Sequence, residues 1–357
     1  RSMGAEASRE PSGIPQTGWG FAVPGGEAWF PGVGSGSVSD PVAVPLTPAV
    51  AVSVWLFDPV TVVLVGLAAL GYWRAWRSAP ATDRGGPDGN TSAAAWCFGA
   101  GLVLWLLTGC SAIAVYAPVL FWMRALQVLV LMFAVPLLLA CGRPVATVRA
   151  GLGGGARRRL DDALASTPAR MLISPAPTAL VMLGTPWLLY LTPWYVASMT
   201  GPIASATRVL LVLIGFGYFY SRIQADPVPH RYSPMISICI SVAESIGDGL
   251  LGVVLWLGPL VAVDYYAGLH RTWGPSPRVD QSIGAGILWL VADVLSLGFL
   301  LVLMRALRLH EARRAEQVDA ELDAADLSVA DGDAPGPEPP GAPWWLSDPQ
   351  LRARFGR

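Results

Sequence analysis

The chain has little charge: only 14% of its 357 residues are Asp, Glu, Lys or Arg, while 53% are hydrophobic. A soluble domain carries roughly a quarter charged residues, so this scarcity excludes an ordinary soluble fold and indicates an integral membrane protein. Lysine is absent, and all 24 basic residues are arginine. Together with the many Ala, Gly, Pro and Val residues, the missing lysine indicates a GC-rich bacterial genome.

Histidine is also scarce. The three histidines, His230, His270 and His310, all lie outside the long apolar stretches. This excludes a histidine-based copper or zinc site inside the membrane. The four cysteines show no C-x-x-C spacing, so we expect buried thiols and no disulfide framework. The soft sulfur side chains nearest the predicted outer face are Cys110, Met123 and Met199. They have no ligand spacing, and a Cu(I) site built from them is the alternative to simple packing.

Catalytic signatures are absent as well. The sequence contains no G-x-S-x-G, H-E-x-x-H, P-loop or dinucleotide-binding motif. The glycine-rich stretch at 151–155 follows no strand pattern and lacks the Lys-Ser/Thr ending of a phosphate-binding loop. We therefore predict that the chain is not an enzyme.

Seven apolar stretches are long enough to cross a bilayer, which takes about 20 residues of helix. They cover roughly residues 55–73, 95–116, 119–141, 176–196, 203–221, 235–263 and 283–304. The pattern predicts an all-α integral membrane protein built as a seven-transmembrane-helix bundle.

The arginines fix the expected orientation of this bundle. Eighteen lie in the loops and tail on one side, and four lie on the other. Because the arginine-rich side faces the cytoplasm, we predict an N-out/C-in, multi-pass protein of the bacterial plasma membrane. Residues 1–54 are then an extracytoplasmic Gly/Pro-rich segment, residues 55–310 the membrane domain, and residues 311–357 an acidic, Pro-rich cytoplasmic tail.

Two further segments have expected roles. The triple arginine at 157–159 predicts an anchor on anionic lipid, with a surface helix over about 157–165 and no nucleic-acid partner. The aromatic end of the tail, residues 343–349, either touches the membrane or docks onto a partner.

Ionisable side chains at membrane depth are functional candidates, because they are costly there without a partner. There are five: Arg124, Arg208, Glu244, Asp248 and Asp293. Glu244 and Asp248 are four residues apart and share one helix face. We expect Arg124 or Arg208 to pair with them, and the acid left unpaired to be protonated. The alternatives are that the arginines snorkel to the outer interface, or that the acids carry protons or cations.

The stretch from Asp280 to Trp289 places an acid, an amide and glycines at the outer mouth of the last span. We expect Asp280 and Gln281 to hydrogen-bond across helix ends. Gly284 and Gly286 lack side chains, so another helix or the polar cluster can come close there. Trp289 follows where an aromatic ring can anchor or pack.

At this point the chain resembles the seven-span CtaG-type family of bacterial cytochrome c oxidase assembly proteins, over most of residues 55–310. The resemblance rests on four pieces in the expected order: Trp55-Leu56-Phe57-Asp58-Pro59; the run from Pro136 to Pro144; Pro193 with Tyr195; and Asp280, Gln281, Gly284, Gly286 and Trp289. It implies a seven-helix protein that helps to assemble an oxidase.

The chain also departs from that family. Family members usually carry histidine pairs four apart in spans 3 and 5, and another histidine in span 6. The matching positions here are Arg124 with Val128, Ala204 with Arg208, and a position near Asp248. Arginine has no lone pair for a metal and stays charged, so it would repel copper. The resemblance therefore implies a retained scaffold with no cofactor.

We accordingly predict a non-enzymatic assembly factor or accessory subunit of a cytochrome c oxidase, or of a related membrane copper enzyme. Its partners would be the lipid bilayer and a respiratory oxidase subunit or other membrane metalloenzyme. One alternative is a proton- or cation-conducting transporter that uses Glu244, Asp248 and Asp293. The other is a copper chaperone that uses Met and Cys ligands.

Overall fold

The computed structural model describes residues 41–42, 44–79, 91–172, 174–223 and 234–330. Every regular element within these ranges is a helix, so the all-α prediction is confirmed. Most of the predicted extracytoplasmic segment, and the end of the predicted tail with its aromatic tip, lie outside the described residues.

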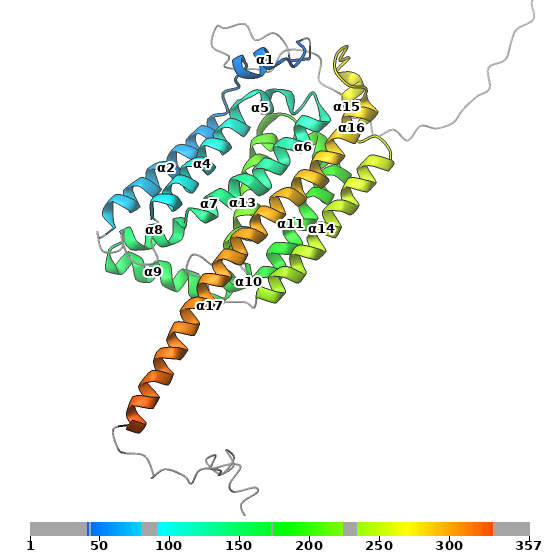
Figure 1. The fold of residues 1–357 in the computed structure, drawn as a ribbon. Coiled ribbons are helices and arrows are strands. Elements are labelled where there is room, and N and C mark those ends of the chain that lie inside the picture. Colours follow the sequence, from blue (N-terminus) through cyan, green and yellow to red (C-terminus); the bar gives the residue numbers. More distant parts are fainter. Residues whose placement is uncertain (1–40, 43, 80–90, 173, 224–233, 331–357) are drawn as a thin grey trace, which may run out of the picture. The chain divides into compact units, whose positions relative to one another are not determined.

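Six helical stretches are long and apolar enough to cross a membrane (Figure 1). They are α2 (Pro59–Ser78), α4 (Thr91–Cys110) with α5 (Ala112–Tyr116), the stretch that begins with α6 (Phe121–Leu129), α13 (Gly201–Ile223), α14 (Pro234–Leu257) and the stretch that begins with α16 (Pro277–Gly286). The chain is therefore a multi-pass membrane protein by the length and composition of its helices.

The remaining predicted span corresponds to α11 (Pro175–Leu191), an apolar helix of 17 residues with Pro186 inside it. At 1.5 Å per residue its length is about 25 Å, which is shorter than the roughly 30 Å hydrocarbon core of a bilayer. α11 packs against α13 and α14 within the bundle. A seventh span and the N-out/C-in orientation stay predictions.

The third spanning stretch lies at the centre of the bundle: 67% of its apolar window is buried, against 11% for α2. It consists of α6, the π-helical turn η1 (Val130–Ala134) and α7 (Val135–Cys141). Pro136 is the second residue after η1, and proline cannot donate the regular helical hydrogen bond. Gly215 of α13 packs on this irregular turn, because a Cβ at Gly215 would overlap the Met132 carbonyl oxygen.

One end of the bundle carries α8 (Pro144–Gly151), α9 (Gly154–Ala165) and α10 (Thr167–Leu172), with α8 packed against α2 (Figure 1). The predicted surface helix at 157–165 is confirmed and begins three residues earlier, at Gly154. No residue of α9 is buried, and its three consecutive arginines are exposed.

The opposite end carries α5 and three further short helices: α1 (Pro48–Ser53), α12 (Trp194–Ala197) and α15 (Val263–Gly268). The segment before α1 is held there by two side chains. Trp273 Nε1 donates to the Val42 carbonyl at 2.6 Å, and the Tyr116 hydroxyl donates to the Val44 carbonyl at 3.1 Å. The last helix continues from α16 through a second π-helical turn, η2 (Ile287–Val291), into α17 (Ala292–Ala330).

Candidate functional site

Asp280, in the first turn of α16, caps a helix other than its own. α6 has no side-chain cap from its own N-cap residue, and Asp280 Oδ1 accepts a hydrogen bond from the Trp122 N–H at 3.0 Å. Asp280 Oδ2 forms an ion pair with Arg271 Nη2 at 3.1 Å. A carboxylate at a helix N-terminus satisfies free N–H groups and interacts favourably with the helix dipole. Asp280 therefore joins α16, α6 and the loop after α15.

Gln281 caps the end of a third helix. Its Nε2 donates to the carbonyls of Leu255 at 2.7 Å and Pro259 at 2.9 Å, and its Oε1 accepts from the Val261 N–H at 2.7 Å. The carbonyls in the last turn of a helix have no hydrogen-bond partner within that helix. The end of α14 therefore needs a donor from elsewhere, and the Gln281 amide provides it. Two adjacent residues thus tie α16 to the start of α6 and to the end of α14.

The two glycines that follow differ from each other. A Cβ at Gly284 would overlap the ring of Phe121, so this glycine lets α16 pack closely on α6. The predicted close approach is wrong at Gly286, where nothing lies within 4 Å of the Cβ position, because this position of the helix faces open space. Trp289 packs against α14, with its Cβ 3.0 Å from the position that a Cβ at Gly252 would take.

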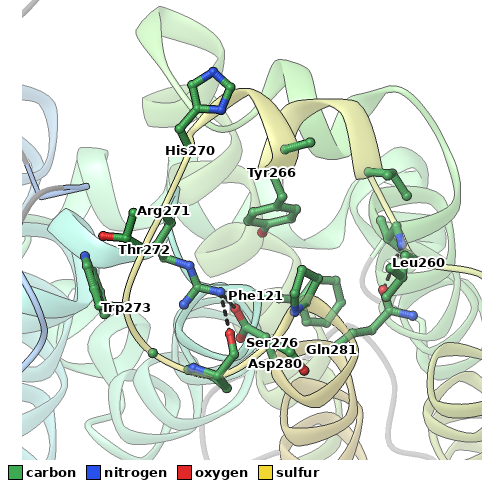
Figure 2. Close-up of a pocket in the computed structure, with 16 residues that line it drawn as sticks. Phe121, Leu260, Tyr266, His270, Arg271, Thr272, Trp273, Ser276, Asp280 and Gln281 are labelled. Carbon is green, nitrogen blue, oxygen red and sulfur yellow. Dashed lines mark hydrogen bonds and ion pairs between the residues drawn. The ribbon is translucent and has the colours of Figure 1, made fainter.

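A cavity of about 340 Å³ lies beside Asp280 (Figure 2). Its size is that of a small ligand pocket. Of its polar lining, Asp280 and Gln281 are hydrogen-bonded within the protein, whereas Arg271 Nη1 is buried without a hydrogen-bond partner. The hydroxyl of Tyr266, which also lines the cavity, lies 2.7 Å from that of Tyr195, and its neighbour Tyr265, outside the lining, donates to the Pro118 carbonyl at 3.0 Å. Burial raises the pKa of Tyr265 to about 12 and raises the pKa of Tyr266 as well, so both are neutral at physiological pH. Figure 2 shows His270 at the rim, away from Asp280.

The predicted partner of Arg208 is wrong. Arg208 Nη2 forms an ion pair at 3.0 Å with Oδ2 of Asp58, the residue just before α2. The hydroxyls of Thr61 and Ser205 also donate to Asp58, at 2.5 and 3.3 Å. Asp58 and Arg208 lie near the starts of α2 and α13, at the same end of the bundle, whereas Glu244 lies well along α14. Asp58, predicted only as a family motif residue, is thus the carboxylate that pairs with Arg208.

Arg124 has no carboxylate within 4 Å among the described residues, so its predicted ion pair with Glu244 or Asp248 is also wrong. Its Nη1 donates to Gln127 Oε1 at 2.9 Å, and its Nη2 donates to Ser198 Oγ at 2.7 Å. Arg124 is 2% exposed and Arg208 is 9% exposed, so neither side chain snorkels to an interface. Arg124 is a buried cation held by neutral partners.

Glu244 pairs instead with Arg222, which lies one residue beyond the predicted span 203–221. The structure places Arg222 in the last turn of α13 with its side chain fully buried, and Nη1 lies 3.2 Å from Glu244 Oε2. Tyr218 donates to the same carboxylate oxygen, and the Arg222 guanidinium lies 4.6 Å from the Tyr218 ring centre. Tyr218 and Arg222 are four residues apart and so share one face of α13. This spacing is the feature of the sequence from which the site around Glu244 could have been predicted.

The other two acids do not pair with arginine in the described part of the chain. Asp293 accepts a hydrogen bond from the Ser245 hydroxyl at 2.6 Å. Asp248 has neither a hydrogen bond nor an ion pair within the described residues. The five predicted site residues therefore form separate groups instead of one cluster.

Copper would need ligands other than the side chains at the expected histidine positions. Where the resemblance expects histidines, the chain has the guanidinium of Arg124 and the apolar side chain of Val128, which is 1% exposed. The described ranges contain no group of three or more His, Cys, Asp or Glu side chains arranged to bind a metal. Met199 and Met123 pack in two different apolar clusters. Cys110 is buried and belongs to neither cluster.

Comparison with known proteins agrees with the fold and motifs. The chain is 24% identical, over 301 residues, to uncharacterized proteins of Mycobacterium bovis and Mycobacterium tuberculosis; each match covers 78% of this chain and 43% of the relative. The chain thus spans less than half the length of these relatives. No solved structure matches it. Residues 69–309, more than half of the chain, match the cytochrome c oxidase caa3 assembly factor family (CtaG), and the chain belongs to that family.

Proposed function

We propose that this protein helps to assemble or stabilise a cytochrome c oxidase in the bacterial plasma membrane, and that it does so without binding copper. Family membership supports the first part. The observation that carries the second part is Arg124, a buried guanidinium at a position where the resemblance expects a metal ligand. Membership of an assembly-factor family supports a non-enzymatic role.

The contacts of Arg124 are those of a fixed crosslink. Through Ser198 it ties α6 to the turn after α12, and its neighbour Gln127 donates to the Thr108 carbonyl of α4 at 3.2 Å. A guanidinium makes several directed hydrogen bonds, offers no lone pair and stays charged. It can therefore hold helices at a set spacing while excluding Cu(I) from the same place.

The partner in this proposal is an oxidase subunit in the same membrane. The test begins with deletion of the gene in its native host and complementation with a tagged full-length chain. We expect the deletion to lower the haem spectrum and activity of the oxidase in membranes, and the tagged chain to restore both. We also expect an oxidase subunit to copurify with the chain in mild detergent.

Copper titration tests the metal-free part separately. The purified chain, freed of its partner, should bind no stoichiometric copper. Tight binding of one copper ion would overturn this part and favour a copper chaperone that uses Cys110, Met123 and Met199. Loss of copurification together with an unchanged oxidase in the deletion strain would overturn the assembly role itself.

Proton or cation transport is the second candidate, because Glu244, Asp248 and Asp293 all lie in the membrane domain. One feature of α14 opposes it. Beyond Asp248 the buried side chains of this helix are Leu251 and Leu255, which are 2% and 1% exposed. Flux into liposomes that is abolished by Glu244→Gln or Asp248→Asn would favour transport over assembly.

A further inference from the structure

Asp248, which is partly buried, lines a small cavity that the assembly role does not use. The cavity measures about 20 Å³ and is otherwise lined by apolar side chains of α6, η1, α11, α14, η2 and α17. A space of this size holds about one water molecule. The Asp248 carboxyl therefore borders a cavity that holds at most about one water molecule.

The wall of this cavity is formed where three helices are irregular. Met132 and Phe133 come from η1, Leu288 comes from η2, and Pro186 interrupts α11. Regular helical hydrogen bonding is disturbed at a π-helical turn and at a proline, and π-helical turns occur often at functional sites. The cavity thus has a structural cause in three neighbouring helices.

Glu244 supplies a second, independent observation. It lies one helical turn from Asp248, is 8% exposed, and its Oε1 is buried without a hydrogen-bond partner, while Oε2 is held by Arg222 and Tyr218. A buried carboxylate oxygen without a donor is costly. The negative charge of Glu244 lies one turn from Asp248 and opposes a second negative charge there.

The charges around Asp248 favour such a proton. The titratable groups that act on it are Glu244 on its own helix and Asp293 on α17, both acidic, with Arg222 and Tyr218 of α13 beyond Glu244. The cavity wall from α6, η1 and α11 is apolar. Arg222 already neutralises Glu244, so no cation of this group is left for Asp248. An unpaired carboxylate at membrane depth is neutralised most readily by protonation.

We propose that Asp248 is a proton-binding site, protonated at neutral pH. Binding takes a proton from water and forms one O–H bond at the Asp248 carboxylate, and no other bond changes. The site binds a proton and does not conduct it across the membrane, which goes beyond the assembly role.

The test is labelling of the purified full-length chain with dicyclohexylcarbodiimide, which reacts with protonated carboxyl groups in apolar surroundings. Peptide mass spectrometry should find the label on Asp248, and labelling should fall as the pH rises. Asp248→Asn should abolish it, whereas Asp293→Asn should leave it in place. Glu244→Gln should shift the labelling curve to lower pH, because the neighbouring negative charge that favours the proton is removed.

Infrared spectroscopy keeps the test independent of reagent access. A carboxylic acid C=O band should be present in the wild type and missing in Asp248→Asn, with both proteins monodisperse in detergent. Absence of both label and band at neutral pH would overturn the proposal. Protection from labelling by Na⁺ at constant pH would overturn it too, since the site would then hold a cation. Neither measurement involves an oxidase, so failure here leaves the assembly role untouched.

Discussion

Removing the Asp280 carboxylate should be the most damaging single change at the α16 corner. Asp280→Ala deletes the acceptor for the Trp122 N–H and leaves Arg271 without its carboxylate, although Arg271 still donates to the Pro275 carbonyl at 2.9 Å. The side chains of Asp280 and Arg271 are only 3% and 9% exposed, so the unpaired charge stays buried. Removing one partner of a buried pair costs about 3–5 kcal/mol.

For a bundle of this size that loss corresponds to a fall of roughly 10 °C in the apparent unfolding temperature. Asp280→Asn should cost about half as much, because its amide oxygen can still accept from Trp122. The double variant with Arg271→Ala should lose about 2 kcal/mol less than the sum of the single losses, since neither charge is then left alone. Tryptophan fluorescence during heating in detergent measures all of these.

The matched control is Arg149→Ala, which removes a partly exposed ion pair with Asp161 and should cost at most about 1 kcal/mol, well below the loss at Asp280. The reasoning is refuted if the Asp280→Ala and Asp280→Asn variants unfold at the same temperature and the double variant is simply additive. In that case Asp280 would contribute through side-chain packing alone, and its capping of α6 would be irrelevant to stability.

Three further predictions use the same assay. Gly284→Ala should destabilise by about 1–3 kcal/mol through overpacking, whereas Gly286→Ala should be neutral or stabilising because helix propensity favours alanine; equal effects would contradict the close packing. Asp58→Asn should cost roughly 3 kcal/mol by leaving Arg208 unpaired, and an unshifted unfolding temperature would contradict the ion pair. Arg124→Met should cost clearly less than Asp280→Ala, because loss of its hydrogen bonds is offset by removal of a buried charge without a carboxylate; an equal fall would mean that this charge stabilises the fold.

The sequence predicted the membrane helices well because hydropathy reports directly on which segments can be buried in lipid. Six of the seven predicted spans have helices of spanning length. The exception, α11, begins at Pro175 and is followed by Thr192 and Pro193, which limit a helix whatever its hydropathy. The π-helical turns η1 and η2 could not be predicted, because they depend on how the neighbouring helices pack.

The α16 motif was predictable in kind but not in detail. An acid and an amide at a helix end must find partners, so hydrogen bonds of Asp280 and Gln281 across helix ends followed from burial alone. Their actual partners, the Trp122 N–H and the end of α14, depend on the three-dimensional order of the helices. The difference between Gly284 and Gly286 has the same cause, since only one of them faces α6.

The ion pairs were mispredicted because only the charges inside the spans were counted. In the structure three arginines form ion pairs with acids at their own end of the bundle. Arg208 pairs with Asp58 and Arg271 pairs with Asp280 at one end. Arg222 pairs with Glu244 towards the other end. Asp58, Arg222 and Arg271 lie at helix boundaries, where a long side chain can still turn inward. Boundary charges therefore have to be considered together with the charges inside the spans.

This sorting of charge by depth has a consequence for function. Both ends of the bundle are fixed by ion pairs, whereas Asp248 and Asp293 lie between them without a countercharge among the described residues. A change of protonation at an ion-paired end would have to break the pair first. At Asp248 it would change only the charge beside three helix irregularities, the two π-helical turns and Pro186. A proton at Asp248, in the middle of the bundle, can therefore alter helix packing without breaking an ion pair.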